Sequence, residues 1–545
     1  MRKKILTRVL GTILTASLFL TGCGGSTLPT VNDPVESSTA SGTTSGGSTT
    51  VAAGEKTITL GQSTLWETFN WMNTTSTPTD YVIEEMFDML FITNTDGTFD
   101  PRLAKSWDVN GTEVVFHLDE KAKWHDGEAV TAEDVVYTFQ VLSTSERTWL
   151  RQGNARYIEG TDENGAELSK DSIAVTAEDE HTVKITLKQA ADPIRIFSAY
   201  FRDIKILPKH LLASTADADI DSAAFWNNPI GSGPFKFVAQ IDGERVEFAA
   251  NKEYHLGAPD FDHFVIRFIN SATLAAALIN GEVDITADAS FSDLELLQNT
   301  PNIVIDSVKS YQYQDMCINL HDSVFTTNVR RAINAAINKQ AIVDNLYKGY
   351  GEAATTFLSS AHPYFNKKLA GSSYDPELAK QLLAEEGWDS SRVLELTVPQ
   401  GNQARERSAL LIQQDLAAVG ITVEINSLDF ATALQNMREN KYDLLLMGAA
   451  GTVDPGDGGV SYFFHAQDID PHYDELWSLQ TSKLSFDERK PILDEYAEYV
   501  DANTPGVFLY YPDRILYYSN KLSNVPVSTT DFWINKQSWT WKVAE

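Results

Sequence analysis

The alternation of apolar and polar positions is most regular in the second half of the chain. Three short apolar runs, at 394–398, 421–425 and 442–447, have the length and composition of buried strands. Two longer segments between them, 403–418 and 430–439, repeat apolar positions at helical spacing. This β-α-β-α-β order predicts an α/β domain with parallel strands.

A second unit of the same kind lies near the middle of the chain. Residues 263–269 predict a strand, 272–279 a helix that stops before a glycine, and 281–285 another strand. This βαβ order predicts parallel strands here as well, and therefore a further α/β domain. The remaining patterns predict strands at 56–60, 172–175, 181–187 and 506–512, and helices at 81–90 and 328–337.

The helix expected after Asp375 has clear signals at both ends. Asp375 is a suitable N-cap, and Gly387 lies just beyond the last apolar position. Leu378, Leu382 and Leu383 recur at helical spacing, so we expect all three to point inward.

The stretch at 114–139, VVFHLDEKAKWHDGEAVTAEDVVYTF, carries three local signals in order. A β-branched and aromatic run opens it, Asp126-Gly127 is a turn dipeptide, and Thr131 with Asp134 forms a capping box. The stretch therefore predicts a strand, a tight turn and a helix. Turn formation explains Asp126 and Gly127 beside His125 better than general acid or base catalysis does.

Length and composition indicate a large globular protein. A chain of 545 residues exceeds the roughly 250–300 at which single cores stop growing, so we expect two or three domains. The 11 Trp, 20 Tyr and 26 Phe supply the apolar volume for large cores. A formal net charge of -32 argues against nucleic acid and anionic lipid as partners.

The N-terminus has the pattern of an export signal. A basic start precedes an apolar run at 9–20, which is too short for a permanent membrane span and suits a signal peptide. The following Leu-Thr-Gly-Cys23 resembles the lipobox of bacterial lipoproteins, which implies lipidation of Cys23 and anchoring to the membrane. Residues 24–54 are rich in Ser, Thr and Gly, so we expect a flexible tether.

Cysteine usage fits an exported protein without an internal disulfide. Cys23 and Cys317 are the two cysteines of the chain, so lipidation of the first leaves the second without a partner. Cys317 lies in the apolar run at 316–320 and is predicted to be a buried small hydrophobe.

Several ordered motifs resemble the solute-binding proteins of ABC importers, in the oligopeptide, dipeptide and nickel-binding family. They are LAKSW at 103–107, WHDG at 124–127, PIGSGPF at 229–235 and GEVD at 281–284. The resemblance runs from about Lys56 to Pro512. It implies an α/β, two-lobed periplasmic-binding-protein-like fold, of type II and the large peptide-binder subtype with an extra domain. Mixed sheets flanked by helices would enclose a hinged cleft.

The resemblance also implies a division of the chain. It comprises a signal peptide at 1–22, a tether at 23–54, lobe I at 55–97, 209–311 and 504–545, an accessory domain of lobe I at 98–208, and lobe II at 312–503. The last segment would return to the first lobe, which the pattern of residues alone does not reveal.

The function implied is that of the lipid-anchored solute-binding component of an ABC importer. Such a protein captures oligopeptides or dipeptides outside the membrane and delivers them to the permease subunits, here as a monomer without a cofactor. Three alternatives stay open: a surface-anchored hydrolase, a binder of oligosaccharide or nickel with the same fold, and a receptor that signals without transport.

Enzyme motifs are absent from the sequence. There is no Gly-x-Ser-x-Gly, His-Glu-x-x-His, phosphate-binding loop or Cys-x-x-Cys, and we expect no enzymatic activity. Carboxylates are too plentiful for a glycosidase pair to be excluded by motif. The run at 465–474 alternates Asp and His, but it lacks the glycine of a calcium loop, so a solvated acidic loop is preferred to a metal site.

Charged ligand contacts are assigned by the resemblance. In the peptide-binding relatives an Asp pairs with the α-amino group of the ligand, and in some an Arg takes its carboxylate. Asp454, in the loop after a predicted strand, is the candidate amine partner, with a turn-forming Asp as the alternative. Arg405 and Arg407 match the region of the carboxylate-binding Arg, and charges on a helix surface are the alternative.

Four further residues are candidate cleft contacts. Trp66 and Phe69 lie in a loop with three aromatic residues, which either lines the cleft or packs into its own domain. Tyr313 and Asn319 lie in the segment expected to cross between the lobes, and ordinary packing is the alternative for both.

Overall fold

The computed structural model describes residues 54–94, 98–288, 291–455, 464–527 and 534–544. The predicted signal peptide, the lipidation site Cys23 and the tether through residue 53 lie outside these residues. Within the described ranges, no helix is long and apolar enough to cross a membrane.

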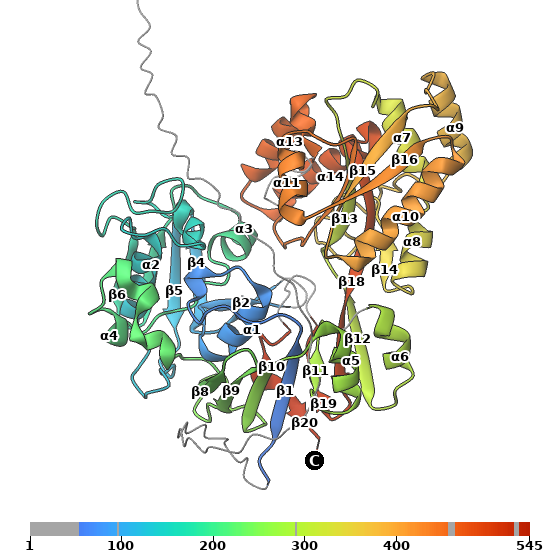
Figure 1. The fold of residues 1–545 in the computed structure, drawn as a ribbon. Coiled ribbons are helices and arrows are strands. Elements are labelled where there is room, and N and C mark those ends of the chain that lie inside the picture. Colours follow the sequence, from blue (N-terminus) through green and yellow to red (C-terminus); the bar gives the residue numbers. More distant parts are fainter. Residues whose placement is uncertain (1–53, 95–97, 289–290, 456–463, 528–533, 545) are drawn as a thin grey trace, which may run out of the picture. The chain divides into compact units, whose positions relative to one another are not determined.

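A long strand near the C-terminus joins two halves of one mixed sheet (Figure 1). This strand, β18 (Gly506–Ser519), pairs antiparallel with β13 (Tyr313–Ile318) and β14 (Gly351–Ala353) through its first residues. Its later residues pair with β11 (Ile285–Thr286) and β12 (Ile303–Lys309). The strand predicted at 506–512 is thus confirmed and extends further, because it serves both halves.

The half of the sheet that contains β13 to β17, with its helices, is called lobe II. There β15 (Val393–Pro399) pairs parallel with both β16 (Thr422–Leu428) and β17 (Leu444–Ala449). The connecting helices are α10 (Gln403–Ala418) and α11 (Phe430–Arg438). The predicted β-α-β-α-β domain is therefore confirmed, and Asp429 caps α11 by accepting a hydrogen bond from the Thr432 N–H at 2.9 Å.

The other half of the sheet, together with an accessory sheet, is called lobe I. Here β1 (Thr57–Gln62) lies parallel to β10 (His263–Phe268) on one side and to β11 on the other. Helix α5 (Ser271–Ile279) connects β10 to β11, so the predicted βαβ unit is confirmed. Strands β9 (Arg245–Ala250) and β8 (Phe235–Ile241) extend the sheet antiparallel.

The accessory sheet is antiparallel and has the strand order β4-β5-β7-β6. Its strands are β4 (Ala104–Asn110), β5 (Glu113–Leu118), β6 (Val175–Asp179) and β7 (Thr182–Thr186). Helix α2 (Ala132–Ser143) begins with the predicted capping box, in which the Thr131 N–H donates to Asp134 Oδ2 at 2.9 Å.

The remaining elements are shorter or lie around these sheets. In lobe I they include α1 (Thr77–Met86), β2 (Phe91–Thr93), β3 (Phe99–Pro101), η2 (Gln152–Tyr157), α3 (Pro193–Arg195), η3 (Ile196–Tyr200), α4 (Lys209–Leu212), α6 (Leu294–Gln298), β19 (Leu522–Ser523) and β20 (Lys542–Val543). In lobe II they are α7 (Thr327–Ala336), α8 (Lys339–Leu346), α9 (Pro376–Glu385), α13 (His472–Thr481) and α14 (Phe486–Asn503).

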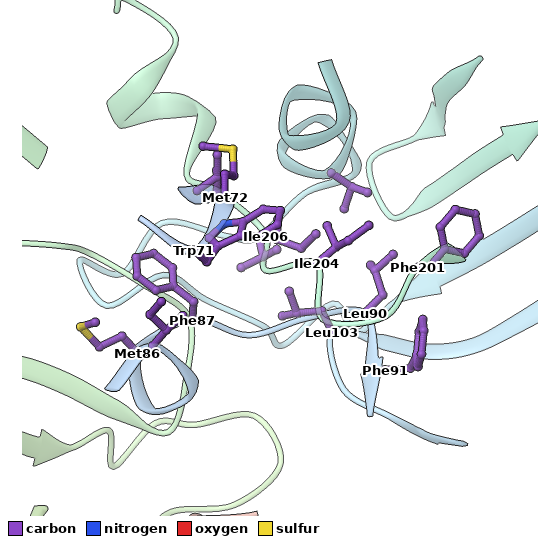
Figure 2. Close-up of a cluster of buried hydrophobic side chains, with 14 of the residues drawn as sticks. Trp71, Met72, Met86, Phe87, Leu90, Phe91, Leu103, Phe201, Ile204 and Ile206 are labelled. Carbon is purple, nitrogen blue, oxygen red and sulfur yellow. The ribbon is translucent and has the colours of Figure 1, made fainter. Parts of the chain in front are cut away.

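Each lobe has its own apolar core. Figure 2 shows part of the lobe I core, where Trp71 is fully buried with Phe87 and Ile206. Lobe II has a core on each face of its sheet, and β13 contributes to both. Met316 and Ile318 belong to one core and Cys317 to the other, because successive strand residues point to opposite faces. Cys317 is fully buried, as predicted, and burial raises the pKa of its thiol.

Two predicted helix details are wrong. The helix expected at 81–90 is α1, which begins earlier and ends at Met86 because Phe87 turns to extended backbone. The Met86 carbonyl instead accepts a hydrogen bond from the Gly233 N–H at 2.8 Å. In α9, Leu382 and Leu383 are buried, but Leu378 is 38% exposed because the buried face runs through Ala379.

The strand predicted at 172–175 is wrong in its start. Strand β6 begins at Val175, because the preceding residues form a turn that bonds to the segment at 159–160. In that turn the Ser172 hydroxyl donates to the Gly160 carbonyl at 2.7 Å, and the Ala174 N–H to the Glu159 carbonyl at 2.9 Å.

The described C-terminal residues contact lobe I. Arg102 Nη1 donates to the Lys536 carbonyl at 3.0 Å, and Asn535 Nδ2 donates to the Tyr81 carbonyl and Glu85 Oε1, both at 2.7 Å. The residue boundaries predicted for the domains stay predictions.

The WHDG and PIGSGPF motifs contact one another. The His125 N–H donates to the Gly231 carbonyl at 2.7 Å, and the Gly231 N–H donates back to His125 Nδ1 at 3.2 Å. The other ring nitrogen of His125, Nε2, donates to the Gly233 carbonyl at 3.0 Å. This arrangement requires a neutral ring, and burial lowers the pKa of His125 to about 4. His125 is thus a structural residue that holds two segments of lobe I together.

Candidate functional site

A cavity of about 380 Å³ is lined by residues of both lobes. Lobe I contributes residues from the start of α1, from the η2 region and from η3 with the turn after it, and lobe II contributes the segment after β17. The lining residues are Thr75, Thr77, Asp80, Arg151, Asn154, Ser198, Ala199, Arg202, Asp203, Thr452 and Asp454. Ala199 is the one apolar residue among them, so the cavity presents hydroxyl, amide and charged groups.

Asp80 and Arg151 form an ion pair in the lobe I wall. Arg151 Nη2 lies 2.9 Å from each carboxylate oxygen of Asp80, and Arg151 Nε donates to the Thr74 carbonyl at 2.7 Å. Burial raises the pKa of Asp80 to about 6, although the positive charge of Arg151 acts in the opposite direction. Arg151 is thereby fixed between the carboxylate and the backbone that precedes α1.

Asp203 is similarly paired. Its Oδ2 accepts from Arg202 Nε at 2.7 Å, and its Oδ1 accepts from Lys536 Nζ at 3.2 Å. Burial acts to raise the pKa of this carboxyl, but Lys536 and Arg202 together hold it below its usual value. Asn154 Nδ2 donates to the Arg202 carbonyl at 3.1 Å, which ties the η2 region to the same wall.

His362 positions the lobe II wall of the cavity. Its Nε2 donates to the Thr452 carbonyl at 2.9 Å, while its Nδ1 accepts from the Tyr364 N–H at 3.1 Å. These bonds require a neutral ring, and burial lowers the pKa of His362 to about 4. The backbone at Thr452 is therefore held from behind by a side chain outside the cavity lining.

Asp454, the predicted amine partner, lies at this cavity but is already paired. It is 2% exposed, its Oδ2 accepts from Arg195 Nε at 2.8 Å, and its Oδ1 accepts from Arg489 Nη2. All three carboxylates of the lining thus have cationic partners within the chain. The role of Asp454 as a ligand contact stays a prediction, and in this conformation both of its oxygens are occupied.

The two predicted arginines diverge at the start of α10. Arg407 is exposed and lines a second cavity of about 460 Å³, which also includes Gln314, Tyr347 and Asp513. Arg405 turns inward, is 9% exposed and donates through Nε to Gln314 Oε1 at 3.1 Å. The structure therefore does not bring Arg407 and Asp454 into one cavity, and both arginine assignments stay predictions.

The four remaining candidates pack within their own lobes. Trp66 and Phe69 are 8% exposed in the lobe I core, where the Phe69 ring lies edge-on to Phe237 at 5.3 Å. Tyr313 packs edge-on against Phe508 at 5.5 Å. Asn319 Nδ2 donates to the carbonyls of Tyr442 at 2.9 Å and Asn440 at 3.2 Å. Of the residues that line either cavity, none is one of these four, and their roles as ligand contacts stay predictions.

The residues of the lobe I wall could not be predicted from the sequence. Asp80, Arg151 and Ser198 belong to no motif and lie up to 118 positions apart in the chain, so no local spacing connects them. Only the folded arrangement of α1, η2 and η3 places them around one space.

No metal site is evident in the part of the chain that the structure describes, where no three His, Cys, Asp or Glu residues are grouped to hold an ion. Charged residues of the acidic segment at 465–474 lie beside histidines or carboxylates of opposite sign instead. His321 Nε2 lies 3.1 Å from Asp468 Oδ2, and His472 Nδ1 lies 3.1 Å from Glu475 Oε2.

Comparison with known proteins identifies the family. The family model described as bacterial extracellular solute-binding proteins, family 5 Middle, matches residues 98–471. The oligopeptide-binding protein AppA of Bacillus subtilis is 26% identical over 548 residues, which is 94% of each chain. Its structure in complex with a nonapeptide has a TM-score of 0.69 at 22% identity and covers 90% of this chain and 100% of that one.

Two further solved structures show the same fold. The ABC transporter substrate-binding protein CtaP of Listeria monocytogenes has a TM-score of 0.78 at 24% identity, covering 90% of this chain and 100% of its own. NikZ of Campylobacter jejuni, solved in complex with Ni(L-His), has a TM-score of 0.68 at 23% identity, covering 89% and 99%. The predicted two-lobed fold of the periplasmic-binding-protein type is confirmed.

Proposed function

The chain belongs to the bacterial extracellular solute-binding proteins of family 5, and from that premise we propose that it captures peptides outside the membrane for an ABC importer. The observation that carries this proposal is the similarity to an oligopeptide-binding protein along 94% of both chains. A match of that extent includes both lobes.

The chemistry of the cavity suits a peptide. A peptide offers backbone N–H and carbonyl groups along its length, and hydroxyls and amides can donate to or accept from either. Thr75, Thr77, Asn154, Ser198 and Thr452 supply such groups around the cavity. Its volume of about 380 Å³ lies in the range of ligand pockets, at the size of a short peptide.

The pairing of the carboxylates supports binding rather than hydrolysis. A hydrolase needs a carboxylate, hydroxyl or imidazole that is free to attack or to take a proton from the reacting group. Asp80, Asp203 and Asp454 are each held by a cation of the chain, and His362 uses both ring nitrogens in structural hydrogen bonds. None of these carboxylates, nor His362, is therefore free to act as a general base for a hydroxyl of the described lining.

We further propose that the protein acts as a monomer anchored through a lipidated Cys23 and passes its ligand to permease subunits. An apolar run of signal-peptide length before Leu-Thr-Gly-Cys23 supports the anchor. The polar tether after it would leave the lobes free to reorient near the membrane.

A combined closure and turnover experiment tests the binding role. The chain from Gly24 onward is mixed with a peptide library, closure is followed by intrinsic tryptophan fluorescence, and the peptides are recovered for mass spectrometry. We expect a saturable fluorescence change with the bound peptides recovered intact. Cleaved peptides would instead support the hydrolase, and the absence of any response to peptides would reject the ligand class.

A further inference from the structure

A one-turn helix of lobe I reaches into lobe II. Helix α3 (Pro193–Arg195) is followed directly by Ile196 and Phe197, which are buried in the lobe I core. Asp192 caps the helix, because its Oδ1 accepts from the Ile194 N–H at 2.9 Å. The Ile194 side chain packs against the core of lobe II. The turn is therefore anchored in one lobe and makes its contacts with the other.

Four charged side chains alternate in sign around this contact. Arg489 of α14 donates through Nη1 to Asp192 Oδ2 at 3.0 Å and through Nη2 to Asp454 Oδ1. Arg195 Nε donates to the second oxygen of Asp454, Oδ2, at 2.8 Å. Asp192 and Arg195 belong to lobe I, while Asp454 and Arg489 belong to lobe II. Two of these three ion pairs thus connect the lobes.

Neutral groups complete the arrangement. The Tyr364 hydroxyl donates to Asp192 Oδ2 at 3.2 Å, and Arg195 Nη1 donates to the Thr481 carbonyl at 3.1 Å. Both of these bonds also run between the lobes. Gln480 Oε1 accepts from Arg489 Nε at 3.1 Å. Arg489 therefore has two partners inside lobe II, Gln480 and Asp454, and neither bond depends on the position of lobe I. Lobe II therefore holds a preformed socket, and α3 fits into it.

Burial makes the pairing selective for this geometry. The side chains of Arg489, Asp454 and Asp192 are 0%, 2% and 4% exposed, and that of Arg195 is 13% exposed. Buried charges without partners are strongly unfavourable, whereas a complete set in good geometry is tolerated. A partial separation of the lobes, in which the charges are no longer paired but are not yet hydrated, would have a high free energy. The contact should therefore have two states: one with the four charged side chains paired between the lobes, and one with the lobes separated and these side chains fully hydrated.

The same segments line the cavity. Ser198 and Ala199 follow α3 by one turn and form part of the lobe I wall, and Asp454 itself is part of the lobe II wall. The contact between α3 and lobe II therefore brings the two walls of the cavity together. Every hydrogen bond of this contact joins two groups of the chain, so none of them requires a ligand.

We propose that Asp192, Arg195, Asp454 and Arg489 form a clasp that holds the two lobes closed over the cavity and slows the release of the ligand. This proposal rests on the proposed function only in placing the ligand in this cavity. Most differences in affinity between related complexes are differences in dissociation rate, which is the step that the clasp would control.

Arg195→Met tests the clasp with a matched control. The substitution removes the charge of Arg195 while keeping an unbranched chain, and Asp454 keeps Arg489 as its partner. Lys188→Met is the control, because Lys188 lies on the same segment, is exposed, and its Nζ donates to the Asp162 carbonyl of its own lobe at 3.0 Å. Asp192→Asn is a second variant, which removes a charge but retains an oxygen to cap α3.

Two measurements decide the outcome. Small-angle X-ray scattering of the protein without added ligand should show a larger radius of gyration for Arg195→Met and Asp192→Asn than for wild type and Lys188→Met. Stopped-flow dissociation of a bound peptide should be about tenfold faster in the same two variants, the equivalent of one charge-assisted hydrogen bond. Equal radii and equal dissociation rates in all four proteins would overturn the proposal. The scattering result does not depend on the ligand, so it stands or fails separately from the peptide assignment.

Discussion

His125 accepts a hydrogen bond at Nδ1 from the backbone N–H of Gly231, 3.2 Å away, across 106 positions of the sequence. The same ring donates to Gly233, where the chain is packed so closely that a side chain at Gly231 would meet the Met86 carbonyl. Two of the motifs that resemble the family, WHDG and PIGSGPF, thus form one structural joint in lobe I. This joint lies apart from the cavity lining, which explains why these motifs carry no information about the ligand.

We predict that His125→Ala lowers the free energy of unfolding by about 2–4 kcal/mol at pH 7. The substitution leaves the buried N–H of Gly231 without its partner, which costs about 1–3 kcal/mol. It also removes one of two donors to the Gly233 carbonyl, which keeps Asn251 Nδ2 at 3.2 Å, and this loss costs about 0.5–1.5 kcal/mol. Urea denaturation measures the difference. His117→Ala is the control, because His117 is 36% exposed and its substitution should change stability little. Equal stability of His125→Ala and wild type would contradict the structural role.

The joint should also make stability depend on pH. The pKa of His125 falls from 6.5 in the unfolded chain to about 4 in the folded protein, so folding favours the neutral ring. Its contribution is complete above pH 6.5 and is lost as the pH falls from 6.5 toward 4. His362 has the same shift and adds to the loss. The unfolding free energy of wild type should therefore drop more steeply over this window than that of His125→Ala, and parallel curves would refute the assignment.

Asp454→Asn should act mainly on stability. Removing one charge from a buried ion-pair set leaves the two arginines undercompensated, which costs about 3–5 kcal/mol. Urea denaturation of wild type and variant measures this difference. Ligand affinity should fall as well, because the variant also weakens the clasp.

A comparison of two peptides separates this role from recognition of a ligand amine. If Asp454 is occupied by Arg195 and Arg489, a free and an N-acetylated peptide should lose affinity by the same factor in the variant. If Asp454 pairs with the amine, wild type should prefer the free peptide by about tenfold and the variant should lose that preference. Calorimetric titration of both proteins with both peptides distinguishes these outcomes, and the second would restore the role predicted from the sequence.

The location of the ligand is tested by filling the cavity. Ala199→Trp places a large side chain in the lobe I wall, where Ala199 is half-buried beside Ser198. We expect peptide affinity to fall at least about tenfold, because the Trp side chain would fill space that the ligand occupies. The folded structure should be retained, because Ala199 is only half-buried and overpacking costs about 1–3 kcal/mol even in a well-packed core. Ala384→Trp, on the exposed side of α9, is the control for added aromatic surface. Unchanged affinity in Ala199→Trp would place the ligand elsewhere.

The sequence predicted the architecture better than the site, for a physical reason. Strand and helix signals are local, so α10 could be predicted with its observed ends and α11 to within one residue. The local pattern gave the wrong helix end where a distant segment supplied a hydrogen-bond partner. Helix α1 ends at Met86, and the Met86 carbonyl accepts a hydrogen bond from the Gly233 N–H. The local spacing of residues does not predict contacts between distant segments.

The site depends almost entirely on such distant contacts. The family resemblance assigns Asp454 to the ligand amine, and its loop after a predicted strand is a common ligand position. The residue does lie at the cavity. Its occupation by Arg195 and Arg489, which are 259 and 35 positions away, could not be predicted from the sequence. Only the family resemblance carried information over such separations.

The anchor is tested at its own residue. Cys23→Ser removes the thiol that lipidation requires, so the protein should move from the membrane fraction to the soluble or secreted fraction. Cys317→Ser is the matched control, because Cys317 is fully buried and should leave the distribution unchanged. Immunoblots of both fractions measure the effect. Retention of Cys23→Ser in the membrane fraction would reject lipidation at this residue.

The class of ligand is the central claim, and isothermal titration calorimetry of the chain from Gly24 onward tests it most directly. The titrants are a panel of peptides of two to nine residues, a panel of oligosaccharides, and Ni²⁺ with and without histidine. We predict saturable one-to-one binding for members of the peptide panel, with no heat of binding for the other two panels. Binding of oligosaccharide or of a nickel complex in the absence of any peptide binding would contradict the account, while leaving the family and its fold unchanged.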